Sequence, residues 1–561
     1  MKSILRSFSE HGTFVQPDAL NYIMSKEKPE DFTSFIIKNL KEYPLVLTAD
    51  QIKSIELEQQ QSTKIEEIPK PSVSDSVEKE VQKKVFSNLY GGEMRHRPPS
   101  EENGLEDDAD KDDLIESDED PEEETAMPKL IEIKQVKGWK PKAKEYEPEI
   151  RIIKDVTGNS TCEGTVKDFT KLFVNRYNVL RKILQNQRRE MVNVMPINRA
   201  KKSSVKEIQM IGIVKDVRTT VNGHRLIELE DETDVATCIA LKSNHETVQM
   251  ANEVVFDEII GIKGQLSKNG DLIIIHSIVF PDISMQHEKH KSEVPVFAAF
   301  LSDIHIGSKM FMENEWQAFL RWINGELGNS RQKDVAGRIK YLVLPGDLVD
   351  GIGIYPNQEK ELSITDVYRQ YEALAEQFKL IPDYISIIIQ PGNHDAVRPA
   401  EPQPAFEKEI QNLFSGKDIT FVGNPCYFSL HGVEVLSYHG QSLLDFATNI
   451  QSLKYNEPVE TMKIMLKKHH LAPTYGGYTP LAPEHSDYMI IDRVPDIFVT
   501  GHVHVATIGD YRGVTLINAS SWQSQTSYQK MLNFIPDSAK LPIVDLKVGN
   551  VTMMDFSRKL A

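Results

Sequence analysis

The sequence is poor in cysteine, and its three cysteines, Cys162, Cys238 and Cys426, lie far apart in 561 residues. No two of them form a CxxC pair, which excludes a zinc ribbon and argues against a framework of disulfides. Such cysteine usage is typical of a protein that works in a reducing compartment. We therefore expect an intracellular protein without structural disulfides.

The sequence also lacks an apolar run of about eighteen residues, the length that a membrane-spanning helix needs. The first residues, Met1 to Arg6, do not begin a signal peptide, because no apolar stretch and cleavage site follow the positive charges. Internal repeats, a P-loop and a GxGxxG motif are missing as well. These absences predict a cytoplasmic protein with no membrane partner.

Basic charge is not in surplus, since the net charge of the chain is −18. The acidic charge is concentrated in residues 101–125, which hold fifteen Asp or Glu residues and the single basic residue Lys111. The rest of the chain carries a net charge of only about −4. A nearly neutral body can bind a polyanion through local basic patches. The overall charge therefore does not exclude DNA as a partner.

The length of the chain predicts a multidomain protein, because one hydrophobic core rarely extends over so many residues. Residues 1–55 place apolar side chains at helical spacing and predict a small N-terminal helical module. Residues 56–145 contain the acidic stretch and few aromatics, which predicts a disordered acidic linker. This linker is either a solvated tether or a mimic of the charge of DNA.

Residues 146–290 predict an OB-like β-barrel preceded by a helix over Val166–Leu184. Asn222-Gly223 and Asn269-Gly270 are strong signals for hairpin turns. Five strands are expected, at Ile208–Val217, Arg225–Glu230, Ala236–Leu241, Val254–Gly264 and Leu272–Ile278. Because aromatics are scarce on these strands, the barrel can equally be a nucleic-acid reader or a structural and partner-docking module.

Residues 291–561 alternate apolar strands with helical patterns such as Trp316–Leu327 and Ile364–Leu380, as expected for an α/β layered domain. Five of the apolar runs end directly in polar motifs with the potential to bind metals. These motifs are Asp303-Ile304-His305, Gly346-Asp347, Gly392-Asn393-His394-Asp395, His439-Gly440 and Gly501-His502-Val503-His504. Side chains at the ends of buried strands are held on rigid elements and can meet in one crevice.

Carboxylate, imidazole and amide oxygen together suit a pair of divalent cations better than a thiolate site does. Asp347 is the expected bridging ligand, since Gly346 lets the backbone approach closely. The remaining expected ligands are Asp303, His305 and His504 for one ion, and Asn393, His439 and His502 for the other.

His394 follows the expected ligand Asn393 and is placed to protonate a departing oxygen. Asp395 is expected to orient the imidazole of His394. Each motif alone is weak, but five in order, each after a strand, predict a dinuclear metallophosphoesterase. His470 and Tyr475, on a later Pro- and Gly-containing segment, either line the substrate cleft or stabilise that loop.

These motifs resemble those of the calcineurin-like phosphoesterase superfamily. The barrel before them, and the segments Leu471–Gly476 and Ser521–Thr526, resemble the small subunits of archaeal family-D DNA polymerase, which belong to the polymerase B-subunit family. The resemblance covers residues 150–561 and implies a 3′→5′ proofreading exonuclease that acts on the 3′ end of DNA and is associated with the nucleoid. It implies two divalent ions, foremost manganese, although magnesium, iron and zinc also tolerate such ligands. It further implies a large catalytic subunit as partner, and a sliding clamp contacted through the holoenzyme.

Two segments differ from other known motifs. Metallophosphatases often continue their Gly-Asp motif with Arg-Gly, whereas here Asp350-Gly351 follows without the arginine, which weakens a phosphatase interpretation. Gln529–Ile535 has its aromatic residue one position too early for a clamp-binding peptide, and we expect this segment in the core. Two alternatives to the polymerase-associated exonuclease remain, namely a stand-alone metal-dependent nuclease or phosphoesterase, and a catalytically silent scaffold subunit.

Overall fold

The computed structural model describes residues 127–559, except 135, 204, 206 and 286, together with 14–15, 22–24, 26, 29–39, 46–47 and 52. The chain forms two compact units, Met1–Lys83 and Lys84–Ala561. In the first unit, helix α3 (Pro29–Asn39) is accompanied by the parallel strand pair β1 (Phe14–Val15) and β2 (Val46–Leu47). Residues 56–126, the greater part of the predicted acidic linker, lie outside the described residues.

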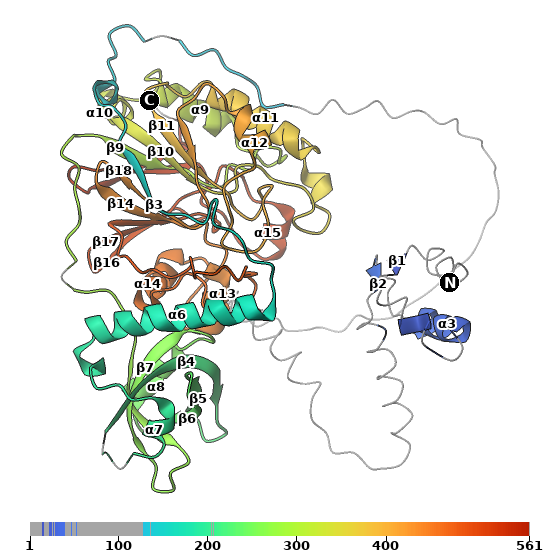
Figure 1. Ribbon diagram of the computed structural model, residues 1–561. Helices are drawn as coiled ribbons and strands as arrows, with labels where there is room; N and C mark the ends of the chain where they lie inside the picture. Colours follow the sequence, from blue (N-terminus) through green and yellow to red (C-terminus); the bar gives the residue numbers. More distant parts are fainter. Residues whose placement is uncertain are drawn as a thin grey trace, which may run out of the picture. The chain divides into compact units, whose positions relative to one another are not determined.

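Two six-stranded sheets form the α/β part of the second unit (Figure 1). The first sheet has the order β12 (Ile419–Phe421), β11 (Ser386–Gln390), β10 (Ile339–Pro345), β9 (Phe297–Phe300), β18 (Lys540–Asp545) and β19 (Val551–Asp555). The second has the order β16 (Thr507–Tyr511), β17 (Val514–Asn518), β15 (Ile497–Thr500), β14 (Val433–Ser437), β13 (Cys426–Leu430) and β3 (Ile150–Lys154). The five strands predicted to precede the polar motifs are β9, β10, β11, β14 and β15.

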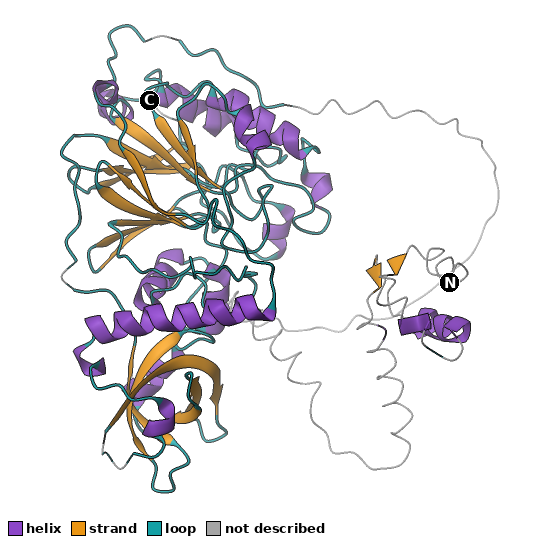
Figure 2. Ribbon diagram, in the orientation of Figure 1, coloured by secondary structure: helices purple, strands orange, loops and turns teal. Residues whose placement is uncertain are grey.

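Buried side chains on both faces explain why these strands are continuous apolar runs rather than alternating ones. On β10, Tyr341 and Val343 pack into the core between the two sheets, whereas Leu342 and Leu344 pack against outer helices. Those helices are α9 (Glu313–Ile323), α10 (Ser330–Ala336), α11 (Val367–Phe378) and α12 (Lys408–Leu413). The second sheet is covered by α13 (Leu443–Asn449) and α14 (Pro458–Lys468), so both sheets lie between helical layers (Figure 2).

The predicted barrel is a closed five-stranded barrel with the order β4-β5-β6-β8-β7. Its strands are β4 (Ile208–Thr219), β5 (Arg225–Glu230), β6 (Val235–Ala240), β7 (Ile259–Leu266) and β8 (Ile273–Val279), with helix α8 (His245–Asn252) between β6 and β7. Gly223 and Gly270 have φ near +79°, a left-handed conformation that glycine adopts without strain, at the tips of the β4–β5 and β7–β8 hairpins. Both hairpin turns predicted from Asn-Gly are thus confirmed.

Strand β3 does not belong to the barrel, although the sequence prediction placed residues 146–290 together. It is an edge strand of the second sheet, where Ile152 pairs with Phe428 and Ile150 with Leu430 of β13. Upstream residues also pack on the α/β part, since a Cβ on Gly325 would lie 2.5 Å from the Trp139 ring. An apolar strand pattern does not say which sheet the strand joins, because pairing is decided by tertiary contacts. The other domain boundaries remain predictions.

Helix α6 (Val166–Gln187) connects β3 to the barrel and crosses between the barrel and the α/β part (Figure 1). It begins at a capping box, in which Thr165 accepts from the amide of Asp168 and the Asp168 carboxylate accepts from the amide of Thr165. Leu180 and Leu184 pack against barrel residues such as Ile259. Within the described part of the chain, no helix combines the length and the apolar character that crossing a membrane requires.

Candidate metal centre

The expected ligands stand on tight turns at the ends of their strands. Asp303, His305, Asp347 and His502 all have φ between +51° and +64°, the left-handed region that is strained for residues with side chains. Such strain persists only where the surrounding structure enforces it, and it clusters at functional sites. The turns direct carboxylates and imidazoles from both sheets toward one place.

Three glycines of the motifs allow this convergence. A Cβ on Gly346 would lie 2.5 Å from His439 Nδ1, and one on Gly392 would lie 2.2 Å from Asp347 Oδ1. A Cβ on Gly501 would lie 2.0 Å from Ser302 Oγ. No real Cβ tolerates such distances, so the glycines are needed because backbone and ligand side chains approach closely.

Asp347 lies at the centre of the site, with its side chain buried. Its Oδ2 atom lies 3.3 Å from His439 Nε2 and 3.9 Å from His305 Nε2, while Oδ1 accepts a hydrogen bond of 2.9 Å from the backbone amide of His394. One carboxylate thus lies near imidazoles that follow strands of the two different sheets. This is the position that a bridging ligand between two cations requires.

The first group of ligand atoms belongs to Asp303, His305 and His504. His305 Nε2 and His504 Nε2 face each other at 3.2 Å, and His504 Nε2 lies 3.3 Å from Asp303 Oδ1. Asp303 is held in place because both carboxylate oxygens accept from the backbone amide of His502. Two ring nitrogens and a carboxylate oxygen this close together fit a cation between them.

The second group belongs to Asp347, His439 and His502. Asn393 adds its amide oxygen Oδ1, which lies 3.0 Å from His439 Nε2. His439 Nδ1 lies 2.8 Å from the carbonyl oxygen of Pro345, so that Nδ1 carries the proton and Nε2 turns to the site. A backbone carbonyl that fixes the imidazole in this way is a common support of metal-binding histidines.

Burial and charge set the protonation of these groups. Burial raises the pKa of Asp347, but the charges of His439 and His394 outweigh it and hold the pKa well below its usual range. Burial lowers the pKa of His439, and the charge of Asp347 overcomes this effect and raises it to about 10. Burial and the nearby charge of His439 lower the pKa of His502 to about 3. A cation at this site would displace the proton of His439, since metals bind neutral imidazole.

His394 lies beside the two groups and lines the cavity above them. Its Nδ1 atom lies 2.8 Å from the backbone oxygen of Asp350, so Nδ1 donates there and Nε2 faces the cavity, 4.0 Å from Asp347 Oδ2. The Asp350 carboxylate also reaches His305, with Oδ1 3.0 Å from Nδ1. Asp350 therefore supports both histidines, a role that the sequence analysis did not assign.

The prediction that Asp395 orients His394 is wrong. The Asp395 carboxylate accepts instead from the backbone amides of Gly392 and Leu348 and from the Tyr371 hydroxyl. Burial and the charge of Asp347 raise the pKa of Asp395 to about 7. Adjacency in sequence did not indicate which groups the two side chains contact, because Asp395 bonds to amides of the turn after β11 whereas His394 Nδ1 bonds to the Asp350 carbonyl.

The sequence of the chain matches known proteins over the region that holds the motifs. The family model that describes the B-subunits of DNA polymerases alpha and epsilon matches residues 298–507. The DNA polymerase II small subunit of Archaeoglobus fulgidus is 46% identical over 388 residues, which cover 69% of this chain and 77% of the relative. The chain belongs to the archaeal DNA polymerase II small-subunit family, that of family-D polymerases.

Two other members of the small-subunit family are similar to this chain over most of its length. The protein of Methanocaldococcus jannaschii is 43% identical, with 72% of this chain and 69% of the relative covered. That of Methanothermobacter thermautotrophicus is 40% identical, with 74% of this chain and 84% of the relative covered. The likeness therefore extends well beyond the family-model match.

In this small subunit the candidate metal centre opens into a cavity of about 430 Å³. His305, Asp347, Asn393, His394, His502 and His504 line it, together with several aromatic residues. Among these are Tyr528 and Phe534, which lie on and just after helix α15 (Ser527–Met531). The expectation that Gln529–Ile535 is core sequence is wrong, since α15 buries none of its residues and the segment lines the cavity instead.

Neither His470 nor Tyr475 is among the described residues that line this cavity. His470 is fully buried, and its Nε2 atom lies 2.9 Å from Asp487 Oδ2. The ring of Tyr475 packs on Phe169 of α6 at a centroid distance of 4.7 Å. These contacts match the alternative in which the two residues stabilise their loop.

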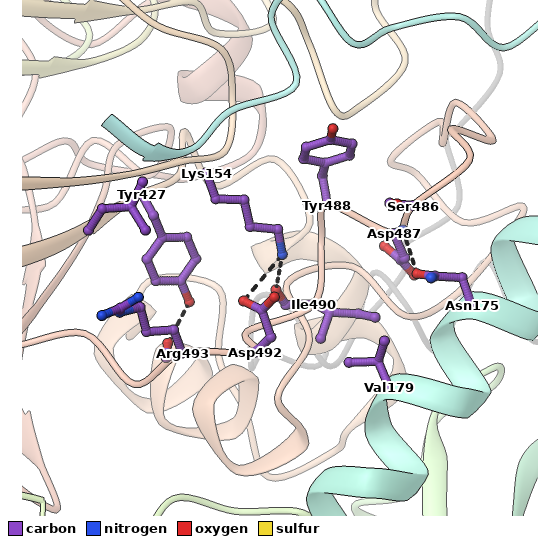
Figure 3. A pocket seen from close by; sticks show the side chains of 11 residues that line it. Lys154, Asn175, Val179, Tyr427, Ser486, Asp487, Tyr488, Ile490, Asp492 and Arg493 are labelled. Atoms are coloured by element: carbon purple, nitrogen blue, oxygen red, sulfur yellow. Dashed lines mark hydrogen bonds and ion pairs between the residues drawn. The ribbon is translucent and has the colours of Figure 1, made fainter. Parts of the chain in front are cut away.

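A larger cavity of about 560 Å³ lies elsewhere, between β3, α6 and the loop before β15. Figure 3 shows Lys154 reaching Asp492 and Asn175 beside Asp487 within it. None of the predicted metal ligands is among the residues that line it. Size alone does not identify the reactive site, and the smaller cavity has the converging carboxylates and imidazoles.

Proposed function

We propose that this chain is the nuclease of a two-subunit archaeal replicative DNA polymerase, a calcineurin-like metallophosphoesterase that hydrolyses the 3′-terminal phosphodiester of DNA. The observation that supports this most is the position of Asp347 Oδ2 between His439 Nε2 and His305 Nε2, with a cavity above it. A carboxylate shared by two imidazole groups is typical of two-metal phosphoesterases. The resemblance of the motifs supports the same reaction.

The residues of the site fit two divalent ions. Asp303, His305 and His504 would hold one ion, Asn393, His439 and His502 the other, and Asp347 both. Bound divalent ions, foremost manganese, would supply the Lewis-acid chemistry that phosphodiester hydrolysis needs. Within the described part of the chain, thiolates do not contribute, since Cys238 and Cys426 are buried elsewhere and Cys162 lies outside this group.

The side chain of His394 completes the proposed reaction. Its Nδ1–H bond to the Asp350 carbonyl orients the ring, and Nε2 is left facing the cavity. From this position His394 would donate a proton to the departing 3′ oxygen. Asp350 is the positioning residue, because it contacts both His394 and the expected ligand His305.

The relatives are named as small subunits of DNA polymerase II. From that name we propose that this chain assembles with a large catalytic subunit and works on the 3′ end of the DNA that this partner extends. Contact with a sliding clamp would come through the holoenzyme. A proofreading role follows if the nuclease acts on ends that the polymerase has just made.

The test uses the full chain with an Asp347→Asn substitution and, as a matched control, Asp334→Asn at an exposed surface pair. Release of mononucleotides from a 3′-mismatched primer is measured with manganese, alone and with the large subunit. We expect Asp347→Asn to lower the rate more than about 100-fold, because even residues that only support a metal ligand are worth about 10–100-fold. Retained activity in Asp347→Asn, with the control unchanged, would exclude the proposal.

A further inference from the structure

The cavity over the metal centre has aromatic walls that the proposed hydrolysis does not use. Tyr355, Tyr478, Tyr528 and Phe534 come from three separate segments and line the same cavity as His394 and Asp347. Aromatic rings that converge from distant segments form a surface for flat ligand groups.

Tyr528 is presented to the cavity on a supported ring. It stacks on Tyr355, with 5.6 Å between the ring centroids and 25° between the planes. The hydroxyl of Tyr355 lies 3.3 Å from Glu361 Oε2 and donates to it, which holds the supporting ring in place. Tyr528 is nevertheless 43% exposed. A ring that is fixed on one side and open on the other can stack on a further planar group.

Tyr478 is also fixed through its backbone, although the residue is 57% exposed. Its amide donates to Asp445 Oδ1 at 2.6 Å, and the next amide, that of Thr479, donates to Asp445 Oδ2 at 3.0 Å. A Cβ on Gly477 would lie 2.3 Å from the same carboxylate, so this loop is tightly packed on α13. An exposed aromatic ring on a rigid loop is a further ligand surface.

Two side-chain amides of the cavity, those of Gln523 and Gln529, are already engaged. Among the described residues that line it, none is lysine or arginine. The Gln523 amide donates to Ser308 Oγ and to Asp350 Oδ1, both at 2.9 Å. Gln529 contacts His504 Nδ1 at 3.1 Å through its amide nitrogen. With no lysine or arginine among these residues and both glutamine amides engaged, the lining favours stacking that tolerates any base.

We propose that Tyr528, supported by Tyr355, receives the terminal base of a DNA strand and stacks on it. This inference rests on the proposed nuclease function, since it assumes that the terminal phosphodiester lies at the metal centre. A paired end must first be unstacked to reach the ring, whereas a mispaired or single-stranded end is already free. The four bases are accepted alike, because every base has a face that can stack.

The test compares an oligonucleotide that has a normal 3′-terminal nucleotide with one that has an abasic 3′ terminus. Hydrolysis and equilibrium binding with manganese are measured for the full chain and for Tyr528→Ala, Tyr528→Phe and Tyr368→Ala. Tyr368 lies on α11, is 54% exposed and is not among the residues that line the cavity, which makes it a matched control. We expect the unmodified chain to prefer the normal end by about tenfold or more, the range of one stacked base.

In Tyr528→Ala this preference should fall to about twofold or less, whereas Tyr528→Phe and Tyr368→Ala should keep it. An unmodified chain that treats normal and abasic ends alike, or a Tyr528→Ala variant that keeps the full preference, would overturn the inference. Absence of hydrolysis with base-dependent binding retained would reject the nuclease proposal while supporting the stacking surface. Loss of both would reject the two together.

Discussion

At the scale of single residues, the site depends on how each side chain is held. His439 and His394 both donate through Nδ1 to a backbone carbonyl, of Pro345 and Asp350 respectively, which leaves both Nε2 atoms directed at Asp347. The two rings differ in position, since His439 is fully buried and His394 lines the cavity. The two imidazoles thus have the same hydrogen-bond support but different positions, which fits the roles of ligand and proton donor that we propose for them.

Replacing His394 tests its role as proton donor. We expect His394→Ala to lower the rate on an oligonucleotide by roughly 10²–10⁴-fold, the usual contribution of a general acid. A p-nitrophenyl ester of a nucleotide has a leaving group that needs no proton, so its hydrolysis should fall much less. Steady-state rates on both substrates check this, and equal losses on the two would show that His394 is not the acid.

The convergence of the predicted ligand residues could be inferred from the sequence because each follows a buried strand within a recognisable motif, as Asp347 follows β10. The role of Asp350 could not, because its contacts with His305 and His394 depend on the path of the loop after β10. The same holds for Asp395, whose direction is set by the amides of the turn.

At the scale of elements, the short helix α15 connects the aromatic wall to the candidate metal centre. Thr526 caps it by accepting from the amide of Gln529, and the Gln529 side chain accepts from the amide of Thr526. The same Gln529 side chain contacts His504 Nδ1. An element of five residues therefore positions both Tyr528 and an expected ligand.

Loss of this cap should lower nuclease activity clearly while it lowers the free energy of unfolding only slightly. We expect Thr526→Ala to lower the free energy of unfolding by about 1 kcal/mol, as for other N-caps. Nuclease activity should fall by roughly 10-fold, because the support of His504 is weakened. Thr526→Ser keeps the capping oxygen and should behave like the unmodified chain. Urea denaturation and mononucleotide release, measured in parallel, would contradict this account if both variants were equally active.

The sequence predicted the five strands before the motifs and the barrel hairpins, although β7 begins at Ile259 rather than at Val254. It did not predict α15, since a five-residue helix without buried residues leaves no apolar periodicity. It also gave no sign that β3 pairs with β13. In both cases the sequence lacks the tertiary information, since it does not say which distant segment lies next to a short element.

At the scale of the whole second unit, a buried cluster ties α6 to the α/β part. Arg176 of α6 donates to Asp487 Oδ2 at 2.7 Å and to the carbonyl oxygens of Pro473 and Asp257. His470 meets the same Asp487 oxygen. Because Asp257 lies just before strand β7, the cluster joins the helix, the barrel and the loop of His470. Removing one partner of such a buried ion pair typically destabilises a protein by several kcal/mol.

This cluster predicts a loss of stability in mild acid. Burial and the charge of Arg176 lower the pKa of His470 from 6.5 to about 4, so the folded protein holds this histidine neutral where the unfolded chain protonates it. Keeping His470 neutral contributes roughly 3 kcal/mol to the free energy of unfolding. This contribution is complete above pH 6.5 and is lost as the pH falls to about 4. We expect His470→Gln to flatten the dependence of unfolding free energy on pH in this window. An unchanged slope in urea titrations between pH 7 and 4 would contradict it.

In the proposed nuclease, side chains from both sheets would hold two divalent ions around Asp347. Anomalous X-ray diffraction from crystals of the full chain soaked with manganese tests it directly. We expect two peaks about 3.5–4 Å apart, one among Asp303, His305 and His504, and one among Asn393, His439 and His502. Both peaks should lie against the Asp347 carboxylate. Peaks at other residues, or no peak at this site at saturating manganese, would contradict a two-ion site around Asp347.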